Sequence, residues 1–302
     1  MNFIGKKGVD ISSQNGVADI SKIKQAGYDF VMIRCGYGSD YSEQDDWQFE
    51  NNVAQCEKLG IPWGTYLISY ALNLNQGASE LNHILRLLKN KKPLFPVAYD
   101  VEYLDYRKNN GGWTFENVNA CTSLVLSGLA ENGYYPMLYT GFDEIENYIS
   151  PAVWEKYDMW FAQWWKQCDY TGSNLGMWQY GGETNYIESN SIDGVGVIDK
   201  DKCYKNYPEI IKNGGYNNWK PAKPVLDHNG FEYGDNTLGV MAAKELLRIA
   251  KRQKIITQGV DENSIFGTGT KLAVNEFLRK NGYFENGIAG VNFLRLITKQ
   301  IK

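Results

Sequence analysis

Alternation between short apolar runs and helical patterns is the feature that most limits what this chain can fold into. Such runs predict five strands, separated by helices whose apolar residues recur every three or four positions. The predicted strands are residues 7–12, 30–35, 63–69, 94–102 and 135–139. The predicted helices between them are residues 20–26, 46–59, 78–88 and 115–131. Strands joined by helices pair in parallel, so we expect an α/β fold.

Three more strands are predicted after this repeat, at closer spacing. They lie at residues 158–164, 177–180 and 195–199. A series of eight strands with this pattern, in a chain of 302 residues, is typical of a parallel barrel. In such barrels the catalytic side chains lie at the C-terminal ends of the strands.

Carboxylates stand at several of these strand ends. Asp100 and Glu102 end the fourth strand. Because strand side chains alternate between faces, both point the same way, with Cα atoms about 6 to 7 Å apart. Asp10 ends the first strand, and Asp199 ends the last, which is expected to close the barrel beside the first. Glycoside hydrolysis needs one protonated and one ionised carboxyl held close together. A single acid at a strand end is often a helix cap, but four at one barrel mouth indicate a catalytic site.

Five motifs, in this order, resemble those of the glycoside hydrolase family 25 lysozymes. They are Lys7-Gly-Val-Asp10-Ile-Ser-Ser-Gln14, Phe30-Val-Met-Ile-Arg34-Cys-Gly-Tyr-Gly38, Gly64-Thr-Tyr66-Leu-Ile-Ser-Tyr70-Ala, Tyr99-Asp100-Val-Glu102 and Trp178-Gln-Tyr180. The resemblance covers about residues 5 to 205. It implies an irregular (β/α)-barrel with five β-α units and three further strands. It also implies hydrolysis of the β-1,4 bond between N-acetylmuramic acid and N-acetylglucosamine in peptidoglycan.

The chemistry and the resemblance together assign roles to the acids. Glu102 is the expected general acid, because the neighbouring Asp100 carboxylate and apolar surroundings would raise its pKa. Asp100 is expected to stay ionised, and to stabilise the oxocarbenium-like charge or orient the 2-acetamido group of the substrate, which this family is thought to use. Asp10 and Asp199 are expected to hold water or substrate. Two points stay open: whether a carboxylate is a direct nucleophile, and whether Asp201, on the same strand face, replaces Asp199.

Residues expected to bind the sugar lie mainly at or near predicted strand ends. Aromatic planes stack on the C–H faces of sugar rings, and a buried arginine would find its partner among the acids of the mouth. The expected residues are Arg34, Tyr66, Tyr70, Tyr139, Trp160, Gln163, Trp164, Trp178 and Tyr180. A place in the barrel core is an equal alternative for any one of the aromatic residues.

Metal-dependent and thiol-dependent wall-lytic enzymes are excluded by composition. The two histidines, His83 and His228, are too few for a zinc amidase or a metallopeptidase. The five cysteines are scattered without a C-x-x-C pair, so neither a disulfide framework nor a zinc site is expected. No motif pairs a cysteine with a histidine for a peptidase. We therefore expect neither a metal nor a cofactor.

A change of composition predicts a second, smaller domain. Residues 1–210 are expected to form the catalytic barrel, residues 211–230 a linker rich in Gly, Asn and Pro, and residues 231–302 an all-α domain of three helices. Residues 231–302 carry a net charge of +4, against −8 for the rest. Neither charge is extreme, so a nucleic-acid partner is not indicated.

The middle of this second domain resembles the signature of helical peptidoglycan-binding domains. The match lies in residues 260–277, with inserted residues before Ile265 and with Leu278 where that family often has Gln. The resemblance implies binding to the cell wall. A purely structural bundle, or one through which the chain dimerises, is the alternative.

The leading hypothesis is a modular muramidase of the phage endolysin type that acts on the peptidoglycan of a Gram-positive bacterium. The first residues lack the apolar run of a signal peptide, and no stretch approaches the roughly 18 apolar residues of a membrane span. The protein is therefore expected to be made in the host cytoplasm and to act on the wall after release. The alternatives are a non-catalytic wall-binding protein on the same barrel and a chitinase-like β-glycosidase.

Overall fold

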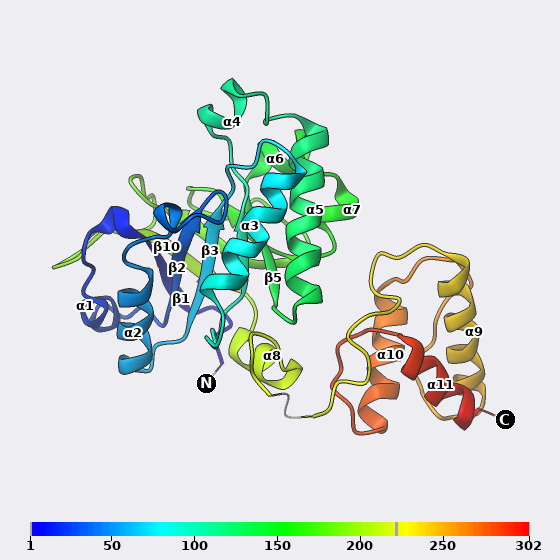
Figure 1. The fold of residues 1–302 in the computed structure, drawn as a ribbon. Helices are drawn as coiled ribbons and strands as arrows, with labels where there is room; N and C mark the ends of the chain where they lie inside the picture. Colours follow the sequence, from blue (N-terminus) through cyan, green and yellow to red (C-terminus); the bar gives the residue numbers. More distant parts are fainter. Residues whose placement is uncertain (1, 221–222, 302) are drawn as a thin grey trace. The chain divides into compact units, whose positions relative to one another are not determined.

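The computed structural model describes residues 2–220 and 223–301. The chain divides into two compact units, Met1–Ile211 and Lys212–Lys302. The first contains a barrel and the second a group of helices (Figure 1). Residues 221–222, within the predicted linker, lie outside the described residues. Within the described part of the chain, no helix is long and apolar enough to cross a membrane.

A closed eight-stranded barrel forms the first unit and confirms the predicted α/β barrel (Figure 1). Its strands are β1 (Lys7–Ile11), β2 (Phe30–Tyr37), β3 (Trp63–Ile68), β4 (Val97–Asp100), β5 (Pro136–Thr140), β6 (Asp158–Ala162), β7 (Leu175–Gly181) and β10 (Asp199–Cys203). They close in the order β1-β10-β7-β6-β5-β4-β3-β2. Every neighbouring pair from β1 to β7 is parallel, so the C-terminal ends of these strands meet at one mouth.

Helices connect most of the parallel strands. They are α1 (Ile20–Gln25), α2 (Phe49–Leu59), α3 (Leu74–Leu87), α4 (Asp105–Asn109), α5 (Phe115–Glu131), α6 (Phe142–Asn147) and α7 (Pro151–Trp154), with short 3-10 turns η1 (Ser13–Asn15) and η2 (Ser42–Gln44). One more helix, α8 (Tyr207–Gly214), follows β10. The four predicted helices are present, as α1, α2, α3 and α5, and local signals explain their ends. The Asn73 side chain accepts a hydrogen bond from the Gln76 N–H at the start of α3, and Gly60 ends α2 with φ of 64°.

Alternation along the strands separates a dry outer layer from a polar interior. The odd-numbered apolar residues of β1 to β4 and β6, such as Val9 and Leu67, and the even-numbered Leu138 of β5 are buried in one cluster with helix residues such as Ile84 and Leu126. Even-numbered residues of β1, β3, β4 and β6, and odd-numbered ones of β5, lie on the other face. The pattern that makes the strands therefore also sends their polar side chains toward the mouth.

The last strand of the barrel differs from the prediction. We expected a parallel strand at residues 195–199, but β10 (Asp199–Cys203) is antiparallel to both β1 and β7. Residues 196–197 instead form β9 (Gly196–Val197), which pairs with β8 (Ser191–Ile192) in a small separate sheet. The sequence of β10, Asp-Lys-Asp-Lys-Cys, has no apolar run because its interior face carries acids. Because β10 runs in the opposite direction, its first residue, not its last, lies at the mouth.

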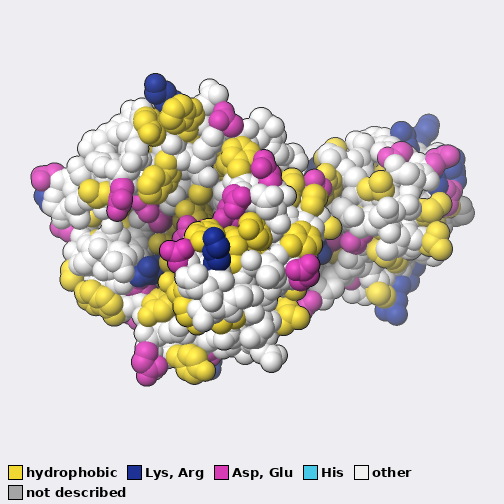
Figure 2. All heavy atoms as spheres, turned by 90° about the horizontal axis from the view of Figure 1, so that it is seen from above, with side chains coloured by type: hydrophobic (Ala, Val, Ile, Leu, Met, Phe, Trp, Pro, Cys, Tyr) yellow, Lys and Arg dark blue, Asp and Glu magenta, His cyan; other side chains and the backbone are white. Residues whose placement is uncertain are grey.

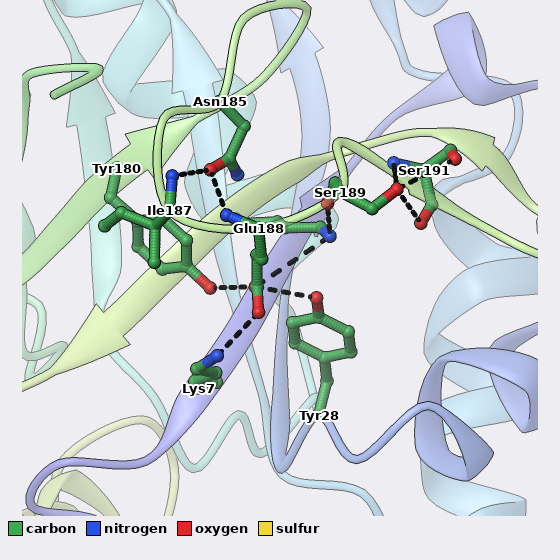
Figure 3. A network of polar contacts seen from close by, with 9 residues as sticks. Lys7, Tyr28, Tyr180, Asn185, Ile187, Glu188, Ser189 and Ser191 are labelled. Atoms are coloured by element: carbon green, nitrogen blue, oxygen red, sulfur yellow. Dashed lines mark hydrogen bonds and ion pairs between the residues drawn. The ribbon is translucent and has the colours of Figure 1, made fainter. Parts of the chain in front are cut away.

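Residues 182–198, which we call the β7–β10 segment, take the place of a helix between the last two strands. The segment is held to the barrel by Glu188, whose carboxylate accepts hydrogen bonds from Lys7 Nζ at 2.6 Å, Tyr28 OH at 3.0 Å and Tyr180 OH at 2.6 Å (Figure 3). Lys200 Nζ lies 3.8 Å from the same carboxylate and donates to the Ser189 carbonyl. One acid thus ties the segment to β1, β7, β10 and the turn before β2.

In the described part of the second unit, three helices follow α8, as predicted. They are α9 (Leu238–Arg252), α10 (Thr268–Lys280) and α11 (Val291–Gln300). A small core that includes Leu247, Phe277 and Phe293 lies between them. Asp227 caps α11 from a distant part of the unit, because its carboxylate accepts the N–H groups of Asn292 at 3.1 Å and Phe293 at 2.7 Å.

Candidate active site

A pocket of about 540 Å³ opens at the mouth of the barrel. Figure 2 looks at this face from above, where the surface is hollowed and acidic side chains lie beside the hollow. The lining residues are Asp10, Ser12, Gln14, Asn15, Arg34, Tyr66, Ile68, Asp100, Glu102, Tyr139, Trp160, Trp164, Gln179, Glu183, Val197 and Asp199. All four acids that the sequence singled out are in this set, so the structure brings them together.

Asp10 and Asp199 face each other across the junction of β1 and β10, where they are paired in register. Asp10 accepts hydrogen bonds from Gln179 Nε2 at 2.9 Å and from Tyr66 OH at 3.4 Å. Burial raises its pKa well above the ordinary value, and the charges of Asp199 and Asp201 raise it further. Burial and the neighbouring Glu183 raise the pKa of Asp199 to about 6. Asp10 and Asp199 therefore keep their protons to a higher pH than carboxyl groups in water do.

Glu102 and Asp100 form the other acidic group of the pocket. Burial raises the pKa of Glu102 to about 7, and the charges of Glu144 and Asp199 add to the effect. The repulsion between the two carboxyls, which we expected to raise the pKa of Glu102, also acts on Asp100. Its pKa is raised well above the ordinary value by burial and then by Glu102 and Asp10. Its Oδ1 is buried and has no hydrogen-bond partner among the described residues.

Asp201 lies deeper in the barrel than Asp199. It is fully buried, its Oδ1 accepts a hydrogen bond from Trp160 Nε1 at 2.7 Å, and it does not line the pocket. Burial raises its pKa well above the ordinary value. Of the two acids that share this strand face, Asp199 is therefore the one that can meet a substrate, whereas Asp201 holds the Trp160 side chain in place.

Arg34 lines the pocket but finds its partners outside the acidic group. Its Nε donates to Asp46 Oδ2 at 2.8 Å and its Nη2 to Ser13 Oγ at 2.9 Å. The expectation that the mouth acids would be its partners is thus wrong for direct contacts. Its charge nevertheless acts on the site, because it lowers the pKa of Asp100.

Three of the expected binding residues lie away from the pocket. Trp178 and Tyr180 occupy the outer face of β7, where Trp178 Nε1 donates to the Gln163 carbonyl at 2.8 Å and Tyr180 OH donates to Glu188. The Gln163 side chain accepts a hydrogen bond from the backbone N–H of Asp169 and donates one to its carboxylate. It therefore stabilises the loop after β6 and does not reach the pocket. The short predicted strand did not reveal which of its faces is interior.

Between Trp178 and Tyr180, the side chain of Gln179 points into the barrel and lines the pocket, which we did not expect. Its Oε1 accepts hydrogen bonds from Tyr139 OH and Trp164 Nε1, both at 2.9 Å, while its amide donates to Asp10. Alternation would have pointed to it once Trp178 was known to face outward. The other missed lining residues are Ser12, Gln14, Asn15, Ile68, Glu183 and Val197.

The aromatic residues divide between the pocket and its edge. Tyr66, Tyr139 and Trp160 line it, and the Trp160 ring lies edge-on to the rings of Tyr66 and Tyr139, at centroid distances of 5.7 and 4.7 Å. These three side chains are at most 8% exposed, so they form its floor. Tyr70 is not a lining residue and lies beside the pocket.

His83, on α3, is fully buried. Its ring nitrogens lie 3.0 Å from the Gly38 carbonyl and 2.7 Å from Asp45 Oδ1, so it braces the loop after β2. Among residues 2–220 and 223–301, no three His, Cys, Asp or Glu side chains are grouped so as to hold a metal ion.

Residues 9–189 match the model of the family described as glycosyl hydrolases family 25, and this span is more than half of the chain. The chain belongs to glycosyl hydrolases family 25. It is therefore a glycoside hydrolase, and the resemblance read from the sequence motifs is confirmed. The autolytic lysozyme of Clostridium acetobutylicum is 22% identical over 273 residues, which are 90% of this chain and 72% of that protein.

Solved structures show the same fold in other family 25 proteins and related enzymes. The modular autolysin LytC from Streptococcus pneumoniae is 24% identical, with a TM-score of 0.57 over 65% of this chain. This chain spans 46% of LytC, less than half of its length. A family 25 glycosyl hydrolase from Bacillus anthracis is 22% identical over 72% of this chain and 95% of its own, with a TM-score of 0.57. The CTP1L endolysin is 20% identical over 82% of this chain and 80% of its own, with a TM-score of 0.56.

Proposed function

We propose that this chain is a lysozyme that cleaves the β-1,4 bond between N-acetylmuramic acid and N-acetylglucosamine in peptidoglycan. The observation that carries the proposal is the pair of Glu102 and Asp100 in one pocket, where the pKa of Glu102 is raised to about 7. An acid with such a pKa keeps its proton near neutral pH and can donate it to a leaving oxygen. Family membership and the name of the Clostridium acetobutylicum relative support the peptidoglycan substrate.

In the proposed mechanism, Glu102 donates its proton to the glycosidic oxygen as the bond to the anomeric carbon breaks. The 2-acetamido oxygen of the same sugar attacks that carbon, and Asp100 Oδ1, which is free for a contact, accepts the acetamido N–H. Water then adds to the anomeric carbon, and Glu102 takes back a proton. The two acids repel each other, so together they favour a single shared negative charge. The proposed mechanism requires that charge on Asp100 while Glu102 is protonated.

Asp10, Asp199 and Gln179 have supporting roles in this proposal. Gln179 connects the Asp10 carboxylate to Tyr139 and Trp164 through three hydrogen bonds of 2.9 Å. This network orients polar groups on the side of the pocket opposite the acid pair and can hold water or a sugar hydroxyl. Direct attack by a carboxylate is the alternative first step, and a trapped glycosyl-enzyme adduct would identify it.

The function is tested by Glu102→Gln on purified cell walls. We expect the unmodified protein to release new reducing ends and the variant to lose at least about 1,000-fold in kcat, because the proton donor is gone. Glu116→Gln, which removes an exposed carboxyl at the start of α5, is the matched control and should remain fully active. Mass analysis of the products should find muramic acid at the new reducing end.

The same experiment separates the two alternatives. A chitinase-like enzyme would leave glucosamine at the new reducing end. A non-catalytic wall-binding protein would bind the walls and release no ends, with and without the Glu102 carboxyl. The intact acid cluster supports the enzyme, because a binding protein has no need to gather Asp10, Asp100, Glu102 and Asp199 at one mouth.

We also propose that the second unit binds the cell wall and that the protein acts as an endolysin on a Gram-positive wall. The support is the signature-like sequence of residues 260–277, which enters α10 of this unit. We expect Glu102→Gln protein to sediment with purified walls, and the same chain ended after Ile211 to remain largely in solution. A second truncated chain, which also ends after Ile211 but keeps Glu102, should still cleave soluble glycan. That activity would verify that the truncated barrel is folded. Equal sedimentation of both chains would contradict wall binding by the second unit.

A further inference from the structure

Three tyrosines outside the pocket form a continuous row of rings beside it. The ring centroids of Tyr37 and Tyr70 are 5.4 Å apart, with planes inclined at 52°. Those of Tyr70 and Tyr106 are 5.5 Å apart, with planes inclined at 41°. The three residues come from separate places, because Tyr37 ends β2, Tyr70 follows β3 and Tyr106 belongs to α4.

The central tyrosine of the row, Tyr70, lies close to the acid pair, because it follows Ser69, whose N–H donates to the Asp100 carbonyl at 2.9 Å. Burial raises the pKa of Tyr70, and the charges of Glu102 and Asp100 raise it further, while Arg34 lowers it. Tyr70 therefore lies within electrostatic reach of the groups that carry out the chemistry. Tyr106, at one end of the row, is exposed to solvent over 49% of its surface.

Buried polar groups hold the central tyrosine of the row in place. The backbone N–H of Tyr70 donates to Glu80 Oε1 at 2.7 Å. Glu80 is fully buried, and its other oxygen accepts hydrogen bonds from Ser69 Oγ at 3.0 Å and Tyr99 OH at 2.5 Å. A buried carboxyl with these partners is a rigid anchor, since any shift of the loop after β3 would break several hydrogen bonds at once.

A second anchor holds the outer tyrosine. Arg107, the residue next to Tyr106 in α4, is fully buried, and its guanidinium lies 4.8 Å from the ring centroid of Trp113. Trp113 in turn packs against the rings of Tyr103 and Tyr148, at 5.7 and 4.9 Å. The helix α4 has only five residues and could not hold a fixed position alone, so this packing is what presents the Tyr106 ring to solvent.

We propose that Tyr37, Tyr70 and Tyr106 form a platform that binds sugar rings of the glycan strand beyond those at the scissile bond. The inference rests on the proposed function, since it takes a glycan as the substrate. Sugar rings present C–H faces that pack on aromatic planes, and anchored rings lose little entropy on binding. A row whose central ring lies beside the acid pair extends the binding site beyond the pocket and makes long strands better substrates than short ones.

The test is Tyr106→Ala on soluble glycan strands of defined, increasing length. We expect KM for the long strands to rise about three- to tenfold with kcat unchanged, because one stacking contact is lost and the acids are untouched. KM for the shortest strand that is cleaved should not change. Tyr106→Phe should behave like the unmodified protein, and Tyr37→Ala should repeat the length dependence from the other end of the row. Ile4→Ala, which removes a 59% exposed apolar side chain just before β1, at the end of the barrel away from the mouth, is the control and should change no KM.

An equal rise of KM for all lengths, or no rise in any, would overturn the platform. If the unmodified protein cleaved no strand of any length, the proposed function would fail instead. Calorimetric titration of the unmodified protein with the same strands would then decide the platform separately. A loss of affinity in Tyr106→Ala that is confined to long strands supports it, and equal affinity of both proteins for long strands overturns it.

Discussion

Glu102 keeps its proton because of neighbours that the linear sequence does not bring near it. Glu144, on α6, is one of them, and its charge raises the pKa of Glu102 beyond the effect of burial. The Glu144 carboxylate is held by the backbone N–H groups of Tyr103 at 3.1 Å and Gly141 at 3.2 Å. Because Tyr103 follows Glu102 directly, this contact also fixes the path of residues 101–104, the catalytic loop that follows β4.

We expect Glu144→Gln to shift the alkaline limb of the pH–kcat profile to lower pH by about half a unit to one unit. Removing a nearby negative charge lowers the pKa of Glu102, so this group loses its catalytic proton at a lower pH. The profile is measured with a soluble glycan. Asp143→Asn removes an exposed carboxyl one residue away and should leave the limb in place. A limb that stays fixed in both variants would mean that Glu144 only braces the loops.

Residue-level prediction from sequence succeeded where local alternation alone decides the outcome. Asp10 and Asp100 stand at the ends of apolar strands. Because side chains alternate between the two faces of a strand, both could be placed on the face opposite their apolar neighbours. The same reasoning failed for Trp178 and Tyr180, because a strand with apolar and polar residues on both faces has no local signal for which face is interior. Gln179, between them, was missed for that reason.

At the scale of elements, the β7–β10 segment shows how the barrel is closed without a covering helix. Glu188 gathers two hydroxyl donors and two ammonium groups from four places in the first unit (Figure 3). Lys200 is only 2% exposed, so its charge depends on this carboxylate and on the Ser189 carbonyl. The segment also carries the lining residues Glu183 and Val197.

We expect Glu188→Ala to lower the free energy of unfolding of the first unit by about 2 to 3 kcal/mol, because it leaves a buried ammonium and two hydroxyls without their partner. Urea unfolding followed by tryptophan fluorescence measures this. Glu188→Gln, which keeps an acceptor for the tyrosines, should lose less. Removing the half-exposed Lys6–Asp29 ion pair, at 3.3 Å, by Asp29→Ala is the control and should cost less than about 1 kcal/mol. Equal losses in Glu188→Ala and Asp29→Ala would rule out a special role for this carboxylate.

At the scale of the whole molecule, the catalytic mouth lowers the stability of the fold that holds it. Burial raises the pKa of Asp10, Asp100 and Asp201 well above the ordinary value, that of Asp199 to about 6 and that of Glu102 to about 7. Each group binds its proton more tightly in the folded than in the unfolded chain. As the pH rises from about 4 toward 7, the unfolded chain gives up these protons first, so the free energy of unfolding falls.

The melting temperature of the first unit should therefore decrease between about pH 5 and pH 7.5. Tryptophan fluorescence reports it, since eight of the nine tryptophans, Trp47 to Trp178, lie in this unit. Asp201→Asn keeps an acceptor for Trp160 without the acid, so it should melt higher at pH 7 and show a flatter pH dependence. A melting temperature that rises over this range, with no change in Asp201→Asn, would contradict the prediction.

Sequence alone determined the α/β barrel, the helical second unit and the acids Asp10, Asp100 and Glu102, because these follow from local periodicity and from motifs that are contiguous in the chain. It named Asp199 correctly as a mouth residue but on the wrong strand, since the polar strand β10 (Asp199–Cys203) has no apolar run by which to recognise it. Only the tertiary structure decided the antiparallel direction of β10, the burial of Asp201, the inward position of Gln179 and the contact of Glu144 with the catalytic loop. Each of these depends on which strands and loops become neighbours when the barrel closes, and no local pattern encodes that.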